Sequence, residues 1–118
     1  MSGASHHRER LAEEIRQEIA VMLAGELKDP RLAVSILVSE VRLGRDHARV
    51  YVVVDGTSAE QQAVLDGLEA ASGYIRFELG ERLQLRRSPR IEFTIDHSQE
   101  YGAHIDELLR RAKEQSGS

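Results

Sequence analysis

The sequence predicts a single α+β domain in which helices cover a three-stranded sheet. Apolar residues recur with the helical period near each end of the chain and again in its middle. Three shorter stretches alternate between apolar and polar residues, as strands with one buried face do. The length of 118 residues suits one domain. The predicted order is helix, strand, strand, a long helical region, strand and a final helix.

The first half of the chain predicts one amphipathic helix and a β-hairpin. A helix is expected from residue 8 to residue 27, and its apolar face consists of Leu11, Ile15, Ile19, Met22, Leu23 and Leu27. Asp29-Pro30 ends this helix, because the residue before a proline avoids the α region. Strands at 34–43 and 48–54 are expected to pair antiparallel across the turn at 44–47. A slip in the alternation predicts a β-bulge near Glu40.

The helical region in the middle of the chain is too long to be one straight helix. Ser58 and Gln61 have the spacing of a capping box, so we expect the helix to begin there. Its buried stripe consists of Val64, Leu68, Ala71, Ile75 and Leu79. A straight helix over 64–85 would reach about 33 Å, whereas a strand of seven residues covers only about 23 Å. The region should therefore bend or divide into two helices.

The stretch Ala71-Ser72-Gly73 is the predicted position of that bend. Gly73 lies opposite the buried stripe, where an exposed glycine costs about 1 kcal/mol relative to alanine. A kink, or the close approach of another molecule's backbone, would offset this cost. The neighbouring Ser72 also favours a kink. A tolerated surface glycine is the alternative interpretation.

The end of the chain predicts a third strand and a last helix. The strand is expected at 91–95, where Ile91, Phe93 and Ile95 alternate with polar residues. The helix is expected from about His104, with Ile105, Leu108, Leu109 and Ala112 on one face. We expect flexible tails at 1–7 and 115–118 around one domain at 8–114.

Composition excludes several classes of protein. The chain has no cysteine, which excludes disulfides and thiolate metal sites and is compatible with the cytoplasm. We expect no membrane span, because no apolar run approaches the roughly 20 residues that one needs.

The net charge is −4, yet residues 28–49 and 76–90 together hold ten basic and five acidic residues. Because screening confines each charge to roughly 10 Å, these segments can attract a polyanion despite the overall negative charge.

No motif predicts an enzyme, a metal site or a cofactor. The run Asp96-His97-Ser98 is not evidence for a catalytic triad, because triad residues converge from separate segments. His97 and His104 lack the spacing of a metal-binding HExxH motif. Neither GxxxxGK[ST] nor GxGxxG is present. We therefore expect a binding protein without catalytic activity.

Several stretches resemble the bacterial ribosome-binding factor A family (RbfA). They are RLAEEIRQEIAVML at 10–23, ELKDPRL at 26–32, ARVYVVV at 48–54 and ASGYIRFELGERLQLRRSPRIEF at 71–93. The resemblance covers roughly residues 8–106 in the family's order. It implies a type II KH-like fold without the GXXG loop that clamps phosphates in RNA-binding KH domains. An Ala-x-Gly kink replaces that loop, here at Ala71, Ser72 and Gly73. The hairpin stretch GRDHARVYV is shorter than is usual in the family.

The same resemblance implies a function in ribosome assembly. It implies binding of the free 30S small subunit through 16S rRNA. It also implies a role in late maturation, including 5′-end rRNA processing, and in growth at low temperature. A monomer is expected, and other assembly factors such as a GTPase are further candidate partners.

The candidate RNA-binding residues are Lys28, Arg31, Arg45, Tyr74, Arg76, Arg82, Arg86 and Arg87. The basic residues would contact phosphates along one flank, and Tyr74 could stack on an unpaired base. Alternative interpretations remain open. Arg82 could pair with Glu78, Arg31 could shield Asp29, and Tyr74 could be a packing residue. A KH-like protein-interaction module without direct RNA contact is the competing function.

Overall fold

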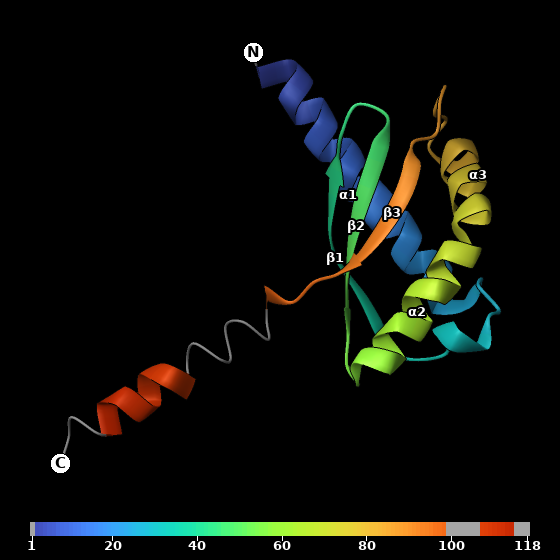
Figure 1. The fold of residues 1–118 in the computed structure, drawn as a ribbon. Coiled ribbons are helices and arrows are strands. Elements are labelled where there is room, and N and C mark those ends of the chain that lie inside the picture. The colour runs from blue at the N-terminus through green and yellow to red at the C-terminus, as the bar shows by residue number, and fades with distance from the viewer. Residues whose placement is uncertain (1, 99–106, 115–118) are drawn as a thin grey trace.

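The predicted α+β class and the order of the elements are confirmed by the structure, a computed structural model that describes residues 2–98 and 107–114. Figure 1 shows the arrangement of the elements. In chain order they are α1 (Ser2–Gly25), the 3-10 turn η1 (Pro30–Leu32), β1 (Ile36–Leu43), β2 (His47–Val54), α2 (Ser58–Ala70), α3 (Ser72–Arg82) and β3 (Arg90–Ile95). Residues 107–114 are also helical. No helix among the described residues is long and apolar enough to cross a lipid bilayer.

The sheet has β2 at its centre. β1 pairs antiparallel with β2, and the register shifts between Val38 and Glu40, which confirms the predicted bulge. β2 pairs parallel with β3, from His47 opposite Arg90 to Val52 opposite Ile95. Parallel neighbours cannot be joined by a tight turn and need a crossover connection. Helices α2 and α3 make that connection.

The core lies between one face of the sheet and the helices. Alternate residues of β2 are buried, namely Ala48, Val50, Val52 and Val54. The helices contribute Ile15, Ile19, Met22, Val64, Leu68, Ile75 and Leu79, and all of these belong to the stripes predicted from the sequence. Each fully buried aliphatic side chain contributes roughly 1.5–3 kcal/mol. This packing holds α1 against β1, and α2 and α3 against β3.

The predicted break in the long helical region is confirmed, and it falls at Ala71. Ala71 has φ −89° and ψ −3°, and it lies between the end of α2 and the start of α3. The Ser72 hydroxyl donates to the Glu69 carbonyl at 2.7 Å. A continuous α-helix would pair that carbonyl with the N–H of Gly73. The hydroxyl therefore competes with the helical ladder at the junction.

Gly73 is not the hinge that the sequence predicted. It is an exposed residue in the first turn of α3 and does not have a positive φ. A Cβ built on Gly73 would meet no atom within 4 Å. The fold therefore does not require a glycine here, because Ala71 and Ser72 supply the break.

The predicted start of the first helix is wrong. α1 begins at Ser2, so the structure has a helix where the sequence suggested a tail through residue 7. The reason is that residues 2–7 contain no proline, and a helix that is already nucleated extends through residues that do not stop it. The predicted start of the last helix at His104 and the tail at 115–118 lie outside the described residues.

The capping box of α2 is also displaced by one residue from the predicted pair, Ser58 and Gln61. Thr57 is the N-cap, and its hydroxyl accepts from the Glu60 N–H at 3.1 Å. The Glu60 carboxylate accepts from the Thr57 N–H at 2.8 Å. Ser58 is already helical, and the Gln61 side chain donates to the Val54 carbonyl at 2.9 Å. Thr57 and Glu60 have the same capping-box spacing, so the sequence pattern alone did not distinguish the two pairs.

Replacing the cap should destabilise the protein measurably. Thr57→Ala leaves the Glu60 N–H without its partner, and loss of such a cap costs about 1 kcal/mol. Ser58→Ala, at the neighbouring helical position, is the matched control and should change the unfolding free energy by less than about 0.5 kcal/mol. Urea unfolding of both variants measures the difference. A larger loss of unfolding free energy for Ser58→Ala than for Thr57→Ala would contradict the assignment of Thr57 as the N-cap.

Candidate nucleic-acid interface

The eight candidate RNA-binding residues lie in different surroundings. Arg45, Arg86 and Arg87 lie at the end of the molecule that contains the β1–β2 turn. Lys28 and Tyr74 lie in a pocket beside the α2–α3 junction. The remaining three, Arg31, Arg76 and Arg82, are held by other parts of the protein.

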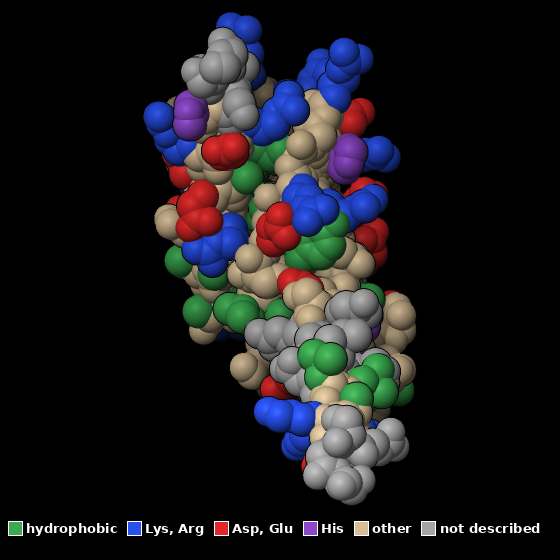
Figure 2. Space-filling view, turned by 90° about the vertical axis from the view of Figure 1, so that its left-hand side faces the viewer, with side chains coloured by type: hydrophobic (Ala, Val, Ile, Leu, Met, Phe, Trp, Pro, Cys, Tyr) green, Lys and Arg blue, Asp and Glu red, His purple; other side chains and the backbone are tan. Residues whose placement is uncertain are grey.

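A groove with arginines around it is present at the end that contains the β1–β2 turn. It is lined by His7, Arg8, Leu11, Leu43, Gly44, Arg45, Leu85, Arg87 and Pro89, and its volume is about 340 Å³. We call it the arginine groove. Three segments contribute to it: the first part of α1, the β1–β2 turn, and the loop from α3 to β3. Figure 1 shows these segments at the same end of the molecule, and Figure 2 shows Lys and Arg side chains gathered at that end.

The charged residues that line the arginine groove are basic. Arg8, Arg45 and Arg87 line it, and none of its described lining residues is acidic. An adjoining hollow adds Arg10 and Arg86, together with Glu14. The exposed side chains of Arg45, Arg86 and Arg87 are therefore surrounded mainly by positive charge, although the whole chain is negative. Such a surface attracts phosphates.

The end of α3 directs Leu85 and Arg87 toward this groove and Arg86 toward the adjoining hollow. Leu83 is the C-cap, and the next residue, Gln84, has φ +55°. The Leu85 N–H donates to the Gly80 carbonyl at 3.0 Å, which is the 6→1 hydrogen bond of a Schellman motif. The Gln84 side chain donates to the Glu81 carbonyl at 2.9 Å. This left-handed turn stops the helix and leads the chain back toward β3.

Arg8 and Arg10 belong to this basic end but were not predicted from the sequence. The charge count assigned them to the acidic remainder of the chain, because it followed sequence segments. Both arginines precede Leu11, the first residue of the predicted apolar stripe. This position was the only sign in the sequence that they lie near one end of the helix. Only the fold shows that this part of α1 lies beside residues 85–87.

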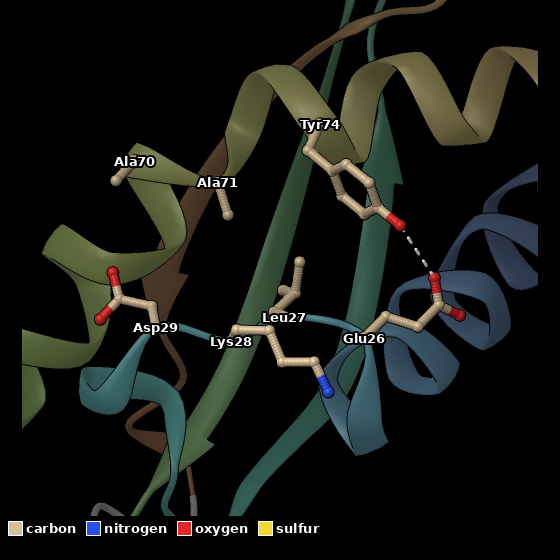
Figure 3. Close-up of a pocket in the computed structure, with 7 residues that line it drawn as sticks. All are labelled: Glu26, Leu27, Lys28, Asp29, Ala70, Ala71 and Tyr74. Carbon is tan, nitrogen blue, oxygen red and sulfur yellow. Dashed lines mark hydrogen bonds between the residues drawn. The ribbon is translucent and has the colours of Figure 1, made fainter.

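The pocket beside the helix junction has a mixed character. It is lined by Glu26, Leu27, Lys28, Asp29, Ala70, Ala71 and Tyr74 (Figure 3). The Tyr74 hydroxyl donates to the Glu26 carboxylate at 3.2 Å. Lys28 donates to the Gly25 carbonyl at 3.1 Å. Tyr74 keeps 45% of its surface exposed, so stacking on a base stays a prediction. The carboxylates of Glu26 and Asp29 in the same pocket disfavour a phosphate.

Arg82 of α3 pairs with three carboxylates: Glu18 of α1, Glu26 just after α1, and Glu78 of α3 itself. It pairs with Glu26, with Glu78 at 3.0 Å and with Glu18 at 3.4 Å, and its side chain is only 26% exposed. The hydrogen bond from Arg82 is the main cause that lowers the pKa of Glu26. The pairing with Glu78 that was considered from the sequence is thus confirmed, and it extends across to α1. Each of its three guanidinium nitrogens already donates to a carboxylate of the protein, so Arg82 has fewer donors for RNA than an unpaired arginine.

Arg31 and Arg76 also have partners within the protein. Arg31 donates to both carboxylate oxygens of Asp29, at distances of 2.5–3.1 Å, and lowers the pKa of that carboxyl to about 2. Asp29 in turn caps η1, so the shielding of Asp29 considered from the sequence is confirmed. Arg76 donates to the Ser88 carbonyl at 3.2 Å, and the Ser88 hydroxyl donates to the Arg76 carbonyl at 2.6 Å. Both of these arginines stabilise local structure.

These features define a class of protein. The chain is a small α+β domain with a KH-like fold and a basic end, and the described residues contain no group of three or more His, Cys, Asp or Glu that could hold a metal. The family model described as Ribosome-binding factor A matches residues 7–109. The chain belongs to the ribosome-binding factor A family.

Individual relatives agree with this assignment. Ribosome-binding factor A of Caldanaerobacter subterraneus subsp. tengcongensis is 39% identical, with 99% of this chain and 98% of the relative covered. That of Koribacter versatilis is 45% identical over 96% of this chain and 93% of the relative. The crystal structure of ribosome-binding factor A from Thermus thermophilus matches with a TM-score of 0.65 and 28% identity, covering 75% of this chain and 94% of that chain.

A further structural match comes from a complex. It is a Thermus thermophilus ribosome binding factor A homology model fitted into the cryo-EM map of a 30S–RbfA complex, with a TM-score of 0.62 and 26% identity. The match covers 76% of this chain and 96% of that chain.

Removing the guanidinium of Arg82 should destabilise the protein at neutral pH. In Arg82→Met, three glutamates would face one another without their shared cation. Because the folded-state pKa of Glu26 is lowered, its stabilising contribution is present above the ordinary glutamate pKa and is lost as the pH falls through the folded value. The difference in unfolding free energy between wild type and variant should therefore shrink as the pH drops below about 4.

Urea unfolding between pH 7 and pH 3 measures this difference. Arg49→Met is the matched control, because Arg49 is half exposed and its ion pair with Glu92 is long, at 3.8 Å. It should change stability little at any pH. Equal effects of Arg82→Met and Arg49→Met would show that the contact between α1 and α3 does not depend on Arg82.

Relieving the left-handed residue after α3 should stabilise the protein. Gln84→Gly removes a conformation that costs an L-residue about 1 kcal/mol, and glycine is the preferred residue at this position. The unfolding free energy in urea should rise by about 0.5–1 kcal/mol, because the loss of the hydrogen bond to Glu81 offsets part of the relief. Gln62→Gly, in the middle of α2, should instead lose about 1 kcal/mol. Destabilisation of both variants would contradict the assigned role of Gln84.

Proposed function

We propose that this protein binds the free 30S ribosomal subunit through 16S rRNA and assists its late maturation. Membership of the ribosome-binding factor A family supports the proposal, and so does the match to the Thermus thermophilus protein fitted in a 30S complex. The protein acts by holding an rRNA segment in one conformation and makes or breaks no bond itself. The finer expectations belong to the same proposal: 5′-end rRNA processing, growth at low temperature, a monomer in the cytoplasm, and a further assembly factor such as a GTPase as a partner.

The observation that carries the RNA part of this proposal is the arginine groove. It brings Arg8, Arg45 and Arg87 together from three segments without an acidic lining residue, and Arg10 and Arg86 lie in the adjoining hollow. Phosphate contacts by these side chains release counterions, so the affinity should fall steeply with salt. By contrast, Arg31 and Arg82 are engaged by carboxylates of the protein itself. The proposed phosphate contacts are therefore those at the basic end.

The competing function is a protein-interaction module that makes no contact with RNA. The observation in its favour is the outer face of α3, where Phe77 is 64% exposed. Docking through apolar contacts of this kind should weaken little between low and moderate salt. The salt dependence of binding therefore separates the two functions.

Charge reversal in the arginine groove should abolish binding to the small subunit. The double variant Arg45→Glu/Arg87→Glu should no longer cosediment with purified 30S subunits, and the wild-type complex should dissociate as salt is raised. Each lost phosphate contact should reduce the slope of log affinity against log salt by about 0.7–0.9. Far-UV circular dichroism should stay unchanged, because both side chains are exposed.

The matched control is Arg42→Glu/Arg49→Glu, which changes the net charge equally. Both arginines are exposed on strands of the sheet, and each faces a glutamate. This control should retain most of the binding. Cosedimentation of the groove variant at the wild-type level would contradict the proposed interface, and binding that is insensitive to salt would favour the interaction module.

A further inference from the structure

The arginine groove has an apolar floor as well as a charged rim. Leu11 comes from α1, Leu43 from the end of β1, and Leu85 and Pro89 from the loop between α3 and β3. All four are partly exposed at the groove. Phosphate binding alone would not need such a surface, because phosphates are recognised by cations and hydrogen-bond donors. The floor therefore indicates a ligand with an apolar part as well as a charge.

We infer that the groove holds one unpaired nucleotide of RNA. The base lies against the leucines and the proline, and the flanking phosphates contact Arg8, Arg45 and Arg87. This inference rests on the proposed function and specifies which form of rRNA the site takes. A volume of about 340 Å³ is at the lower end of the range for small-ligand sites, which suits a single nucleotide better than a longer segment.

Duplex RNA does not fit this combination of surfaces. The bases of an A-form helix are paired and stacked, and its major groove is too narrow for side chains to reach them. A duplex could present only phosphates and sugars to the rim and would leave the apolar floor uncovered. An unpaired base can leave the strand and cover the floor, and an arginine guanidinium can also stack on its face.

The adjoining hollow shares Leu11 and Leu85 with the groove and adds Arg10 and Arg86, but it also contains Glu14. Two further hollows contain two carboxylates each. The pocket beside the helix junction contains Glu26 and Asp29. The hollow next to Gly73 contains Glu69 and Glu92 as well as two arginines. Carboxylates in these places oppose a phosphodiester. Among these hollows, the arginine groove combines apolar and basic lining residues without a carboxylate.

Binding of short oligonucleotides tests the inference directly. The probes are penta-adenosine RNA and an abasic pentamer of tetrahydrofuran residues, which has the same phosphates and no base. Wild-type protein should bind penta-adenosine about tenfold or more tightly than the abasic pentamer at low salt, because only penta-adenosine has a base that can stack in the groove. Equal affinities would overturn the inference, as would absence of binding to penta-adenosine at low salt.

A variant of the floor gives an independent test. Leu85→Asn should weaken the binding of penta-adenosine about tenfold and leave the binding of a short RNA duplex unchanged, because the arginines remain in place. Leu37→Asn, at an exposed leucine of β1, is the matched control and should change neither. If Leu85→Asn does not fold, the comparison of the two pentamers on the wild-type protein still decides. A loss of duplex binding equal to the loss of pentamer binding would count against the base-contacting floor.

These results can be separated from a failure of the proposed function. Cosedimentation of the wild-type protein with 30S subunits, together with equal affinity for the two pentamers, would reject the nucleotide site and leave the proposed function standing. Failure to cosediment at low salt would reject the proposed function itself.

Discussion

The parallel pairing of β2 with β3 is the constraint on which the rest of the structure depends. Both strands run in the same direction, so the chain must travel from Val54 at one end of the sheet back to Arg90 at the other. The crossover is made by two helices, and the break at Ala71 lets each of them follow the sheet and bury its own apolar face. The return also delivers residues 85–89 to the end of the sheet where the β1–β2 turn lies. One wall of the arginine groove is thus a direct consequence of strand direction.

The charged residues of the chain divide into those that hold the fold and those that remain available. Arg82 and Arg31 are exposed in part, but Arg82 pairs with three carboxylates and Arg31 with that of Asp29. Arg45, Arg86 and Arg87 lie where acidic side chains are sparse. A count of arginines in a segment cannot make this distinction, since all of them carry the same charge. What differs is whether a glutamate or aspartate side chain lies within ion-pair distance of the guanidinium.

Much of the fold could be predicted from the sequence, because it follows from local patterns. The stripe from Val64 to Leu79, the bulge near Glu40 and the need for a broken helix all depend on periodicity and length. The position of the break was harder to predict, because Gly73 is the more familiar helix breaker, whereas the structure uses the hydroxyl of Ser72. The site was predictable only in part. Arg8 and Arg82 carry the same charge in the sequence, and only the packed structure shows that Arg8 lines the groove whereas Arg82 pairs with Glu18 and Glu26.

The pairing of β2 with β3 also bears on the order in which the protein becomes competent to bind. α1 and the β1–β2 hairpin are formed by neighbouring stretches of the chain, whereas β3 joins the sheet only after a long loop has closed between residues 54 and 90. Synthesis proceeds from the N-terminus, so the early elements emerge before the strand that completes the sheet. Arg8 and Arg45 are therefore made well before Leu85 and Arg87 take their places beside them. The groove is expected to form in the last step of folding, which ties recognition of RNA to completion of the domain.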